Sequence, residues 1–93
     1  IVAAMSTSAS AADIKQGEKL AKQWCSNCHV IGADQVQGAD SAPAFAAIAE
    51  TAAERTDDLR AWLADPHPPM PNLSLTNYEI DDLLAYIQEL NNQ

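Results

Sequence analysis

The run Cys-Ser-Asn-Cys-His at residues 25–29 constrains this chain more than any other feature. The pattern Cys-x-x-Cys-His is the attachment signature of a covalent c-type haem. Cys25 and Cys28 are spaced to lie on one side of a helical turn, so each sulfur can form a thioether with one vinyl group of the same porphyrin. His29 is then held beneath the ring, where a neutral imidazole nitrogen can bind the iron. The motif therefore predicts one covalently attached haem c.

Three other interpretations of this motif are weaker. A structural zinc site needs four ligands, and because the only histidine besides His29 is His67, carboxylates would have to complete it. A thioredoxin-like redox pair needs a βαβ context, and the sequence contains no convincing strand pattern. A plain disulfide between the two cysteines would make no use of the adjacent histidine. Zinc and dithiol chemistry stay as alternatives to haem attachment.

A second candidate iron ligand lies in the run His-Pro-Pro-Met-Pro at residues 67–71. The sulfur of Met70 is a soft, neutral ligand that would fill the second axial position and raise the reduction potential. Proline fixes its own φ and favours an extended residue before it, so Pro69 and Pro71 leave the loop little freedom to swing the sulfur away. We predict that His29 and Met70 are the axial ligands. The alternative for the methionine is that it fills a gap in the core.

Other residues near these motifs have open roles. His67 is the rival of Met70, because bis-histidine ligation would lower the potential, although an exposed loop histidine is the simpler interpretation. Trp62 is a candidate to pack on the haem near the methionine, or to fill the core. Arg55 and Arg60 are candidates to pair with the haem propionates, or else to face solvent.

The charge balance limits the partners of the chain. Its 93 residues predict one domain, and 5 Lys and Arg against 13 Asp and Glu give a formal net charge of −8. This charge disfavours nucleic acid and anionic membrane surfaces, and it suits a basic or neutral docking surface on a redox protein. So short a chain has a modest core, to which a buried porphyrin would add apolar surface.

The first twelve residues differ from the rest, since they carry no charged side chain before Asp13. Ala-Ser-Ala at residues 9–11 matches a signal-peptide cleavage site, and residues 1–5 match the end of an apolar signal segment. The stretch is too short to span a membrane. We interpret residues 1–12 as a signal-peptide remnant or disordered tail and residues 13–93 as the folded domain, which predicts export to a bacterial periplasm.

Helical patterns divide the rest of the chain. Asp13 is a good N-cap for a first helix, with Gln16 three residues further on, and this helix runs into residues 25–29. Its predicted buried face repeats at spacings of three or four and comprises Ile14, Gly17, Leu20, Ala21 and Trp24. Another face carries Lys15, Lys19 and Lys22 and is either ordinary helix surface or a docking patch.

Two shorter helices are predicted after a loop at residues 30–42. The first can start at Pro43 and carries Phe45, Ile48 and Ala52 inward. The second is predicted to have Thr56 as its N-cap and to end at Asp65, before a proline. Its first turn holds Asp57 and Asp58, and its apolar face comprises Leu59, Trp62 and Leu63.

The last helix follows a second predicted loop at residues 66–75 and has the clearest start signal. Thr76 and Glu79 have the spacing of a capping box, and Leu75 and Ile80 have that of a hydrophobic staple. The apolar stripe of this helix comprises Ile80, Leu83, Leu84, Ile87 and Leu90.

These motifs together make residues 13–93 resemble the class I cytochrome c family. Gly17, eight residues before Cys25, matches the glycine where the family's first and last helices cross. Pro43 resembles the family's proline whose carbonyl accepts the N–H of the proximal histidine, a bond that would fix the tautomer of His29. The resemblance implies an all-α cytochrome c fold, with four or so helices wrapped around one haem.

The sequence departs from the family pattern at two positions that concern packing. Ala21 stands where the family often has an aromatic residue, which predicts a larger partner, Tyr86 or Leu83, on the last helix. Ala42 stands where many members have glycine.

The resemblance implies a monomeric electron carrier that meets a donor and an acceptor protein. With both axial positions filled, the iron has no site for substrate or oxygen, which predicts a carrier that is not an enzyme. One alternative is a permanent haem subunit of a larger oxidoreductase. Another is a haem-based sensor or small-ligand binder, which would require Met70 to leave the iron or never to bind it.

Overall fold

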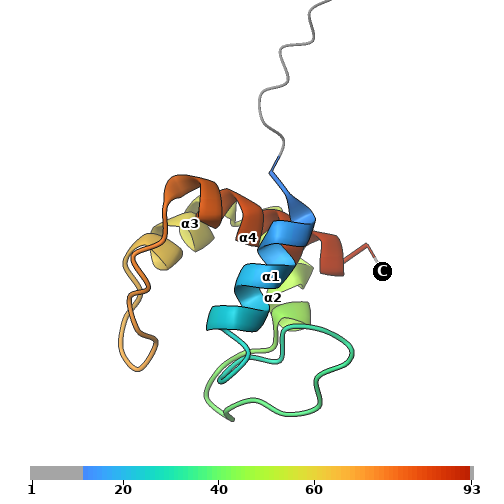
Figure 1. Cartoon of the computed structure of the whole chain (residues 1–93). Helices are drawn as coiled ribbons and strands as arrows, with labels where there is room; N and C mark the ends of the chain where they lie inside the picture. Colours follow the sequence, from blue (N-terminus) through green and yellow to red (C-terminus); the bar gives the residue numbers. More distant parts are fainter. Residues whose placement is uncertain (1–11, 93) are drawn as a thin grey trace, which may run out of the picture.

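The computed structural model describes residues 12–92, and within that range the chain is built from helices and loops without a strand. The helices are α1 (Ile14–Trp24), α2 (Phe45–Ala52), α3 (Thr56–Ala64) and α4 (Asn77–Leu90), arranged as Figure 1 shows. The predicted all-α fold is confirmed. The signal-peptide prediction for residues 1–12 falls, except for Ala12, outside the described residues.

Helix α1 begins where its cap predicts. The carboxylate of Asp13 accepts a hydrogen bond from the backbone N–H of Gln16 at 3.1 Å and so satisfies a donor that the first turn leaves free. Three residues of the predicted inner face, Gly17, Leu20 and Ala21, are buried. Its two ends do not fit the prediction, because Ile14 is 40% and Trp24 51% exposed. The helical period predicts a face but not how far the helix extends beyond the element that covers it.

Helices α1 and α4 cross at Gly17 (Figure 1). A Cβ atom at this position would lie 2.0 Å from the carbonyl oxygen of Asp82 and 2.8 Å from Cβ of Tyr86, so only glycine permits this approach. The backbone N–H of Asp13 also donates to the Asp82 carboxylate at 2.8 Å. Tyr86 therefore lies at this crossing, and it is buried in the same core cluster as Ala21 and Leu83, the other residue predicted as a partner for Ala21.

Helix α4 forms one wall of the core. Its predicted capping box is present: Glu79 N–H donates to Oγ1 of Thr76 at 3.1 Å, and Thr76 N–H donates to the Glu79 carboxylate at 2.8 Å. Its predicted stripe is buried at Ile80, Leu83, Leu84 and Ile87, and Leu90 is partly buried. Helix α2 packs on this wall through Phe45, Ala49 and Ala52.

The predicted start of the third helix is wrong in detail. Thr56 is the first residue of α3 rather than its N-cap, and its hydroxyl donates to the carbonyl of Ala52 at 3.2 Å. Arg55 occupies the N-cap position without a side-chain hydrogen bond. Thr56 thus joins α2 to α3 instead of capping α3.

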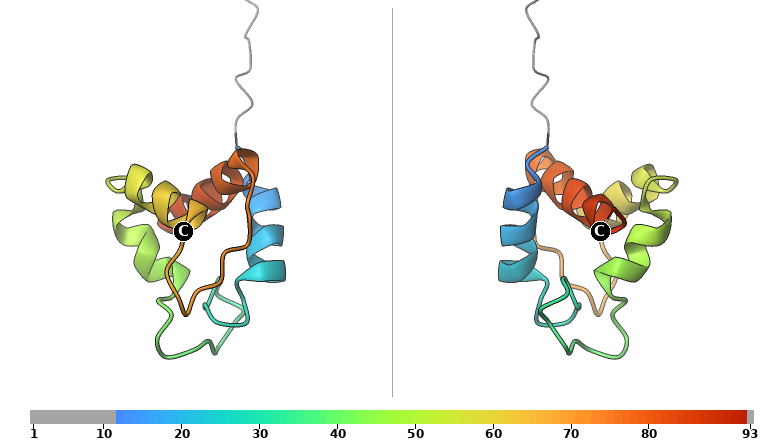
Figure 2. Two further views of the ribbon diagram at one scale, coloured as in Figure 1. Left: turned by 90° about the vertical axis from the view of Figure 1, so that its left-hand side faces the viewer. Right: turned by 90° about the vertical axis from the view of Figure 1, so that its right-hand side faces the viewer.

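Two loops lie on the same side of α4, as both views in Figure 2 show: one precedes α2 and the other joins α3 to α4. They carry the two groups of candidate ligands. No helix in the described part of the chain has the length and apolar character needed to cross a membrane.

Candidate functional site

Residues 25–29 continue the helical path of α1 by one turn. The carbonyl of Cys25 accepts hydrogen bonds from the N–H groups of Cys28 at 3.2 Å and His29 at 2.9 Å. Both cysteines are free, so the predicted alternative of a disulfide is not what the structure shows. Cys25 is buried and Cys28 is exposed. Burial, and secondarily the charge of Cys28, raises the pKa of the Cys25 thiol to about 11, which keeps it protonated at neutral pH.

The imidazole of His29 is held by the backbone of Pro43. Its Nδ1 atom lies 2.6 Å from the Pro43 carbonyl oxygen. A carbonyl can only accept, so Nδ1 carries a proton, and in the neutral imidazole Nε2 is then the nitrogen with the free lone pair. The ring also packs against Phe45, with centroids 5.3 Å apart. His29 is thereby oriented as a neutral ligand with one nitrogen available to a metal.

The side chain of Gln35 forms hydrogen bonds between the loop after His29 and the motif at residues 25–29, a role that the sequence did not predict. Its Nε2 atom lies 2.8 Å from the carbonyl oxygens of both Ser26 and His29, and also from that of Gln37. Its Oε1 atom accepts the N–H of Ile31 at 3.0 Å. A single loop glutamine has no periodicity or spacing by which this role could have been found.

Gly38 brings the same loop directly against the motif. The N–H of Ala39 donates to the carbonyl of Cys28 at 2.7 Å. A Cβ atom on Gly38 would lie only 2.5 Å from that carbonyl oxygen. The loop thus packs by backbone contact, which requires the absence of a side chain here.

Met70 lies in the other loop and contacts Trp62 of α3. The indole Nε1 of Trp62 donates to the Met70 sulfur at 3.1 Å. The N–H of Met70 donates to the carbonyl of His67 at 3.1 Å, which closes a turn. The His67 ring meets the edge of the Trp62 ring, with centroids 5.0 Å apart. Two side chains of one loop therefore contact a single tryptophan.

The two candidate arginines already have protein partners. Arg60 forms an ion pair with Asp81, and both side chains are about two-fifths exposed, at 41% and 42%. Nε of Arg55 donates to Oγ1 of Thr51 at 3.1 Å. The predicted pairing of these arginines with the haem propionates therefore stays a prediction.

The donor set of these residues fits a haem better than a zinc ion. Cys25 and Cys28 provide free thiols within one turn, His29 provides an unprotonated nitrogen, and Met70 provides a thioether. Trp62 adds apolar surface, being 41% exposed to solvent. Within residues 12–92, no three or more His, Cys, Asp and Glu side chains gather into a site that could hold a metal ion.

Comparison with known proteins decides between these chemistries. The profile of the cytochrome c family matches residues 14–91. The chain belongs to the cytochrome c family. It is 42% identical over 89 residues to cytochrome c-552 of Bradyrhizobium diazoefficiens, an alignment that covers 96% of this chain and 86% of that protein. No solved structure gave a significant match.

Membership of this family establishes the cofactor and the general activity. The chain is a haem electron-transfer protein, and its cofactor is covalently attached haem c. The zinc and dithiol alternatives for residues 25–29 are therefore not supported.

Proposed function

We propose that this member of the cytochrome c family carries single electrons between two redox proteins, with His29 and Met70 as the axial ligands of its iron. The observation that carries the proposal is the hydrogen bond from Nδ1 of His29 to the Pro43 carbonyl, which leaves Nε2 as a neutral donor. Met70, the ligand proposed for the opposite axial position, lies in a loop held by its own backbone bond and by Trp62.

Each of the other site residues has a proposed role. Cys25 and Cys28, one helical turn apart, would hold the haem by thioether bonds to its two vinyl groups. Pro43 holds the tautomer of His29, and Trp62 covers part of the ring near Met70. When bound, haem supplies a one-electron couple in which ferric iron gains the electron that the donor loses and returns it to the acceptor.

The proposed pair of axial ligands also argues against catalysis at the iron. With Met70 on the iron, no coordination site is open to a substrate or to oxygen, so we propose a carrier and not an enzyme. A sensor would have to release Met70, and the contacts of this sulfur and of the Met70 N–H oppose that release.

Location and assembly are part of the same proposal. We propose an exported, periplasmic protein, on the basis of residues 1–12, which are small, apolar or hydroxylic and lie almost wholly outside the described residues. We further propose a monomer that meets its partners through small, transient interfaces. Gel filtration of an extract from the native source separates this proposal from its alternative, because a permanent subunit would elute in a stoichiometric complex with its enzyme.

Mass spectrometry under denaturing conditions tests attachment. Protein matured in a host that attaches haem should carry one haem that survives unfolding and organic extraction, because thioethers are covalent. Cys25→Ala or Cys28→Ala should retain at most one linkage. An unmodified polypeptide mass for the wild-type chain would contradict the proposal.

NMR of the ferrous protein tests the second ligand. An iron-bound methionine gives a methyl resonance shifted far upfield by the ring, and Met70→Ala should abolish it, lower the potential and open the iron to carbon monoxide. His67→Ala is the matched control in the same loop and should do none of these. A change of spin state in His67→Ala, with Met70→Ala unaffected, would favour bis-histidine ligation instead.

A further inference from the structure

The loop that precedes α2 (Figure 2) is held to the rest of the molecule by polar contacts. Within residues 33–41 every residue is exposed except Gln35, which is partly buried. The buried core is reached only on either side of this segment, at Ile31 and Phe45. Because no apolar side chain of the segment packs on the core, the amide of Gln35 is its main side-chain attachment.

The orientation of this amide is fixed by its four partners. Its Nε2 atom lies 2.8 Å from the carbonyl oxygens of Ser26, His29 and Gln37, which can only accept. Its Oε1 atom accepts the N–H of Ile31 at 3.0 Å. A reversed amide would place Oε1 against three acceptors and lose all of these bonds. Two of the three carbonyls belong to the haem-attachment motif, so the amide nitrogen of Gln35 joins two residues of that motif.

The same loop also holds the imidazole of His29. Gln35 holds the His29 backbone through its carbonyl, and Pro43, at the far end of the loop, holds the ring through the 2.6 Å contact with Nδ1. Between these two contacts, the N–H of Ala39 donates to the carbonyl of Cys28 at 2.7 Å. The backbone and the ring of one residue are thus positioned by a single loop, and a shift of that backbone changes the alignment of the ring on the Pro43 carbonyl.

We propose that Gln35 is a positioning residue that keeps His29 aligned on the Pro43 carbonyl and thereby lowers the reduction potential of the iron. This inference rests on the proposed role of His29 as axial ligand. It assigns a function in electron transfer to a side chain that touches neither proposed ligand atom.

The direction of the effect follows from the electron density on the ring. An acceptor for the Nδ1 proton leaves more density on Nε2, the atom proposed to bind iron. A more basic ligand stabilises ferric iron more than ferrous iron, so weakening this bond should raise the potential. A merely structural role for Gln35 predicts the opposite change, because a loosened loop admits water to the haem and water stabilises the more highly charged ferric state.

Gln35→Met in the holoprotein tests the proposal, because methionine has nearly the same length and no N–H to donate. The N–H of Phe45 still donates to the Val30 carbonyl at 2.9 Å in this variant, so the bond from His29 to Pro43 should be weakened rather than lost. A whole hydrogen bond can change an equilibrium by about tenfold, and we expect about a two- to fivefold higher ratio of ferrous to ferric protein at a fixed ambient potential. For a one-electron couple, in which tenfold corresponds to about 59 mV, the potential should be higher by about 20–40 mV.

Gln37→Met is the matched control. Gln37 is exposed in the same loop, and among the described residues its side chain has no hydrogen-bond partner. The backbone carbonyl that Gln35 uses is unchanged in this variant, so the potential should equal that of the wild type. An unchanged or lower potential in a folded Gln35→Met protein with low-spin iron would overturn the inference.

NMR of the ferrous protein measures the contact itself and keeps the inference testable if Gln35→Met fails to fold. In the wild type, the Nε2 protons of Gln35 and the Nδ1 proton of His29 should exchange slowly with solvent. In Gln35→Met the Nδ1 proton of His29 should exchange faster. Rapid exchange of the Gln35 protons in the wild type, or unchanged exchange at His29 in the variant, would contradict the proposed role. Ring protons of His29 without the upfield shift that haem gives its axial ligand would instead overturn the proposed ligand set, and the inference with it.

Discussion

The hydroxyl of Tyr86 donates a hydrogen bond to the backbone carbonyl of Ile31, 55 residues away along the chain. Both residues are buried, Tyr86 at 4% and Ile31 at 2% exposure. The ring of Tyr86 also packs near that of Phe45, with centroids 6.5 Å apart, and Phe45 in turn packs on His29. Helix α4 is thereby connected to the loop that follows the haem-attachment motif.

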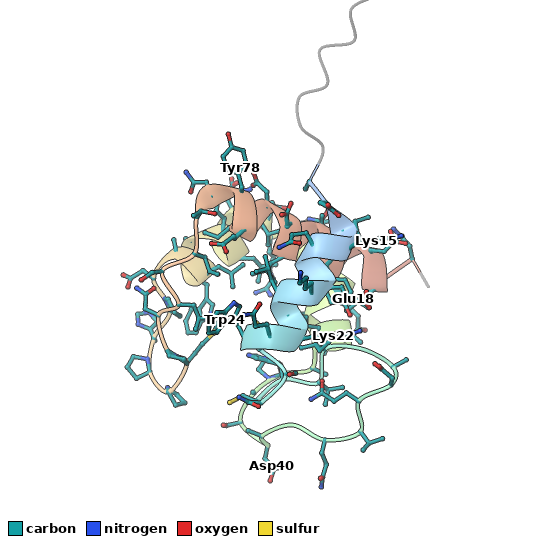
Figure 3. The ribbon with its side chains drawn as sticks, in the orientation of Figure 1. Lys15, Glu18, Lys22, Trp24, Asp40 and Tyr78 are labelled. Carbon is teal, nitrogen blue, oxygen red and sulfur yellow. The ribbon has the colours of Figure 1, made fainter. Side chains whose placement is uncertain are left out.

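Removing this hydroxyl should destabilise the fold. Tyr86→Phe leaves the buried carbonyl of Ile31 without its donor, and an unsatisfied buried group costs about 1–3 kcal/mol. Denaturant unfolding of the holoprotein measures the loss. Tyr78→Phe is the matched control, because this tyrosine is 73% exposed and projects outward at the start of α4 (Figure 3), so its hydroxyl should contribute almost nothing. Equal stability of the two variants would contradict the assigned role.

The same hydroxyl predicts a loss of stability at high pH. Burial, and then the carboxylates of Glu18 and Asp34, raises the pKa of Tyr86 above its ordinary value of 10.0. The folded state therefore holds this proton more tightly than the unfolded chain does. Its contribution to the free energy of unfolding is fully present below pH 10.0 and is lost as the pH rises through the raised pKa. In unfolding measured against pH, Tyr86→Phe should lack this part of the decline and Tyr78→Phe should keep it.

The crossing of α1 and α4 should not tolerate even one methyl group. In Gly17→Ala the new Cβ would collide with the Asp82 carbonyl, so α1 would have to move and strain the Asp13–Asp82 hydrogen bond. The helix propensity gained, about 1 kcal/mol, offsets only part of this strain, and we expect a net loss of at least about 1–2 kcal/mol. Lys19→Ala, an exposed change in the same helix, should alter the unfolding midpoint little. A Gly17→Ala protein as stable as wild type would contradict this crossing.

Features that depend on neighbours in the sequence were predicted well. The Asp13 cap and the Thr76–Glu79 capping box each involve residues three apart, and both are present. The motif at residues 25–29 is equally local. Its spacing alone predicted the helical turn that the hydrogen bonds to the Cys25 carbonyl now show.

Features that depend on the folded chain were missed. The bonds of Gln35 and the bond between Tyr86 and Ile31 join residues whose proximity only the folded loops create. The exposure of Trp24 has the same cause, because helical periodicity does not reveal where a covering element ends. Thr56 was misplaced because its hydroxyl found an acceptor in the preceding helix.

The negative surface charge favours docking to a basic partner. The structure indicates which acidic residues can be replaced to test this docking. Asp81 pairs with Arg60, and Asp82 accepts the N–H of Asp13, so replacing either would also remove a contact within the fold. Asp57 and Asp58 lie exposed in the first turn of α3 and have no ion pair within residues 12–92. Their reversal can therefore report on docking with less effect on folding.

Electron exchange with a partner that has a basic docking face should slow as salt is added. The net charge of −8 attracts such a face, and above the ionic strength at which the Debye length is about 10 Å this attraction is largely screened. In stopped-flow measurements Asp57→Lys combined with Asp58→Lys should lower the second-order rate at low salt and weaken its salt dependence. The potential should stay nearly constant, which separates docking from driving force. A wild-type rate independent of salt would instead indicate docking through an apolar rim around the haem edge.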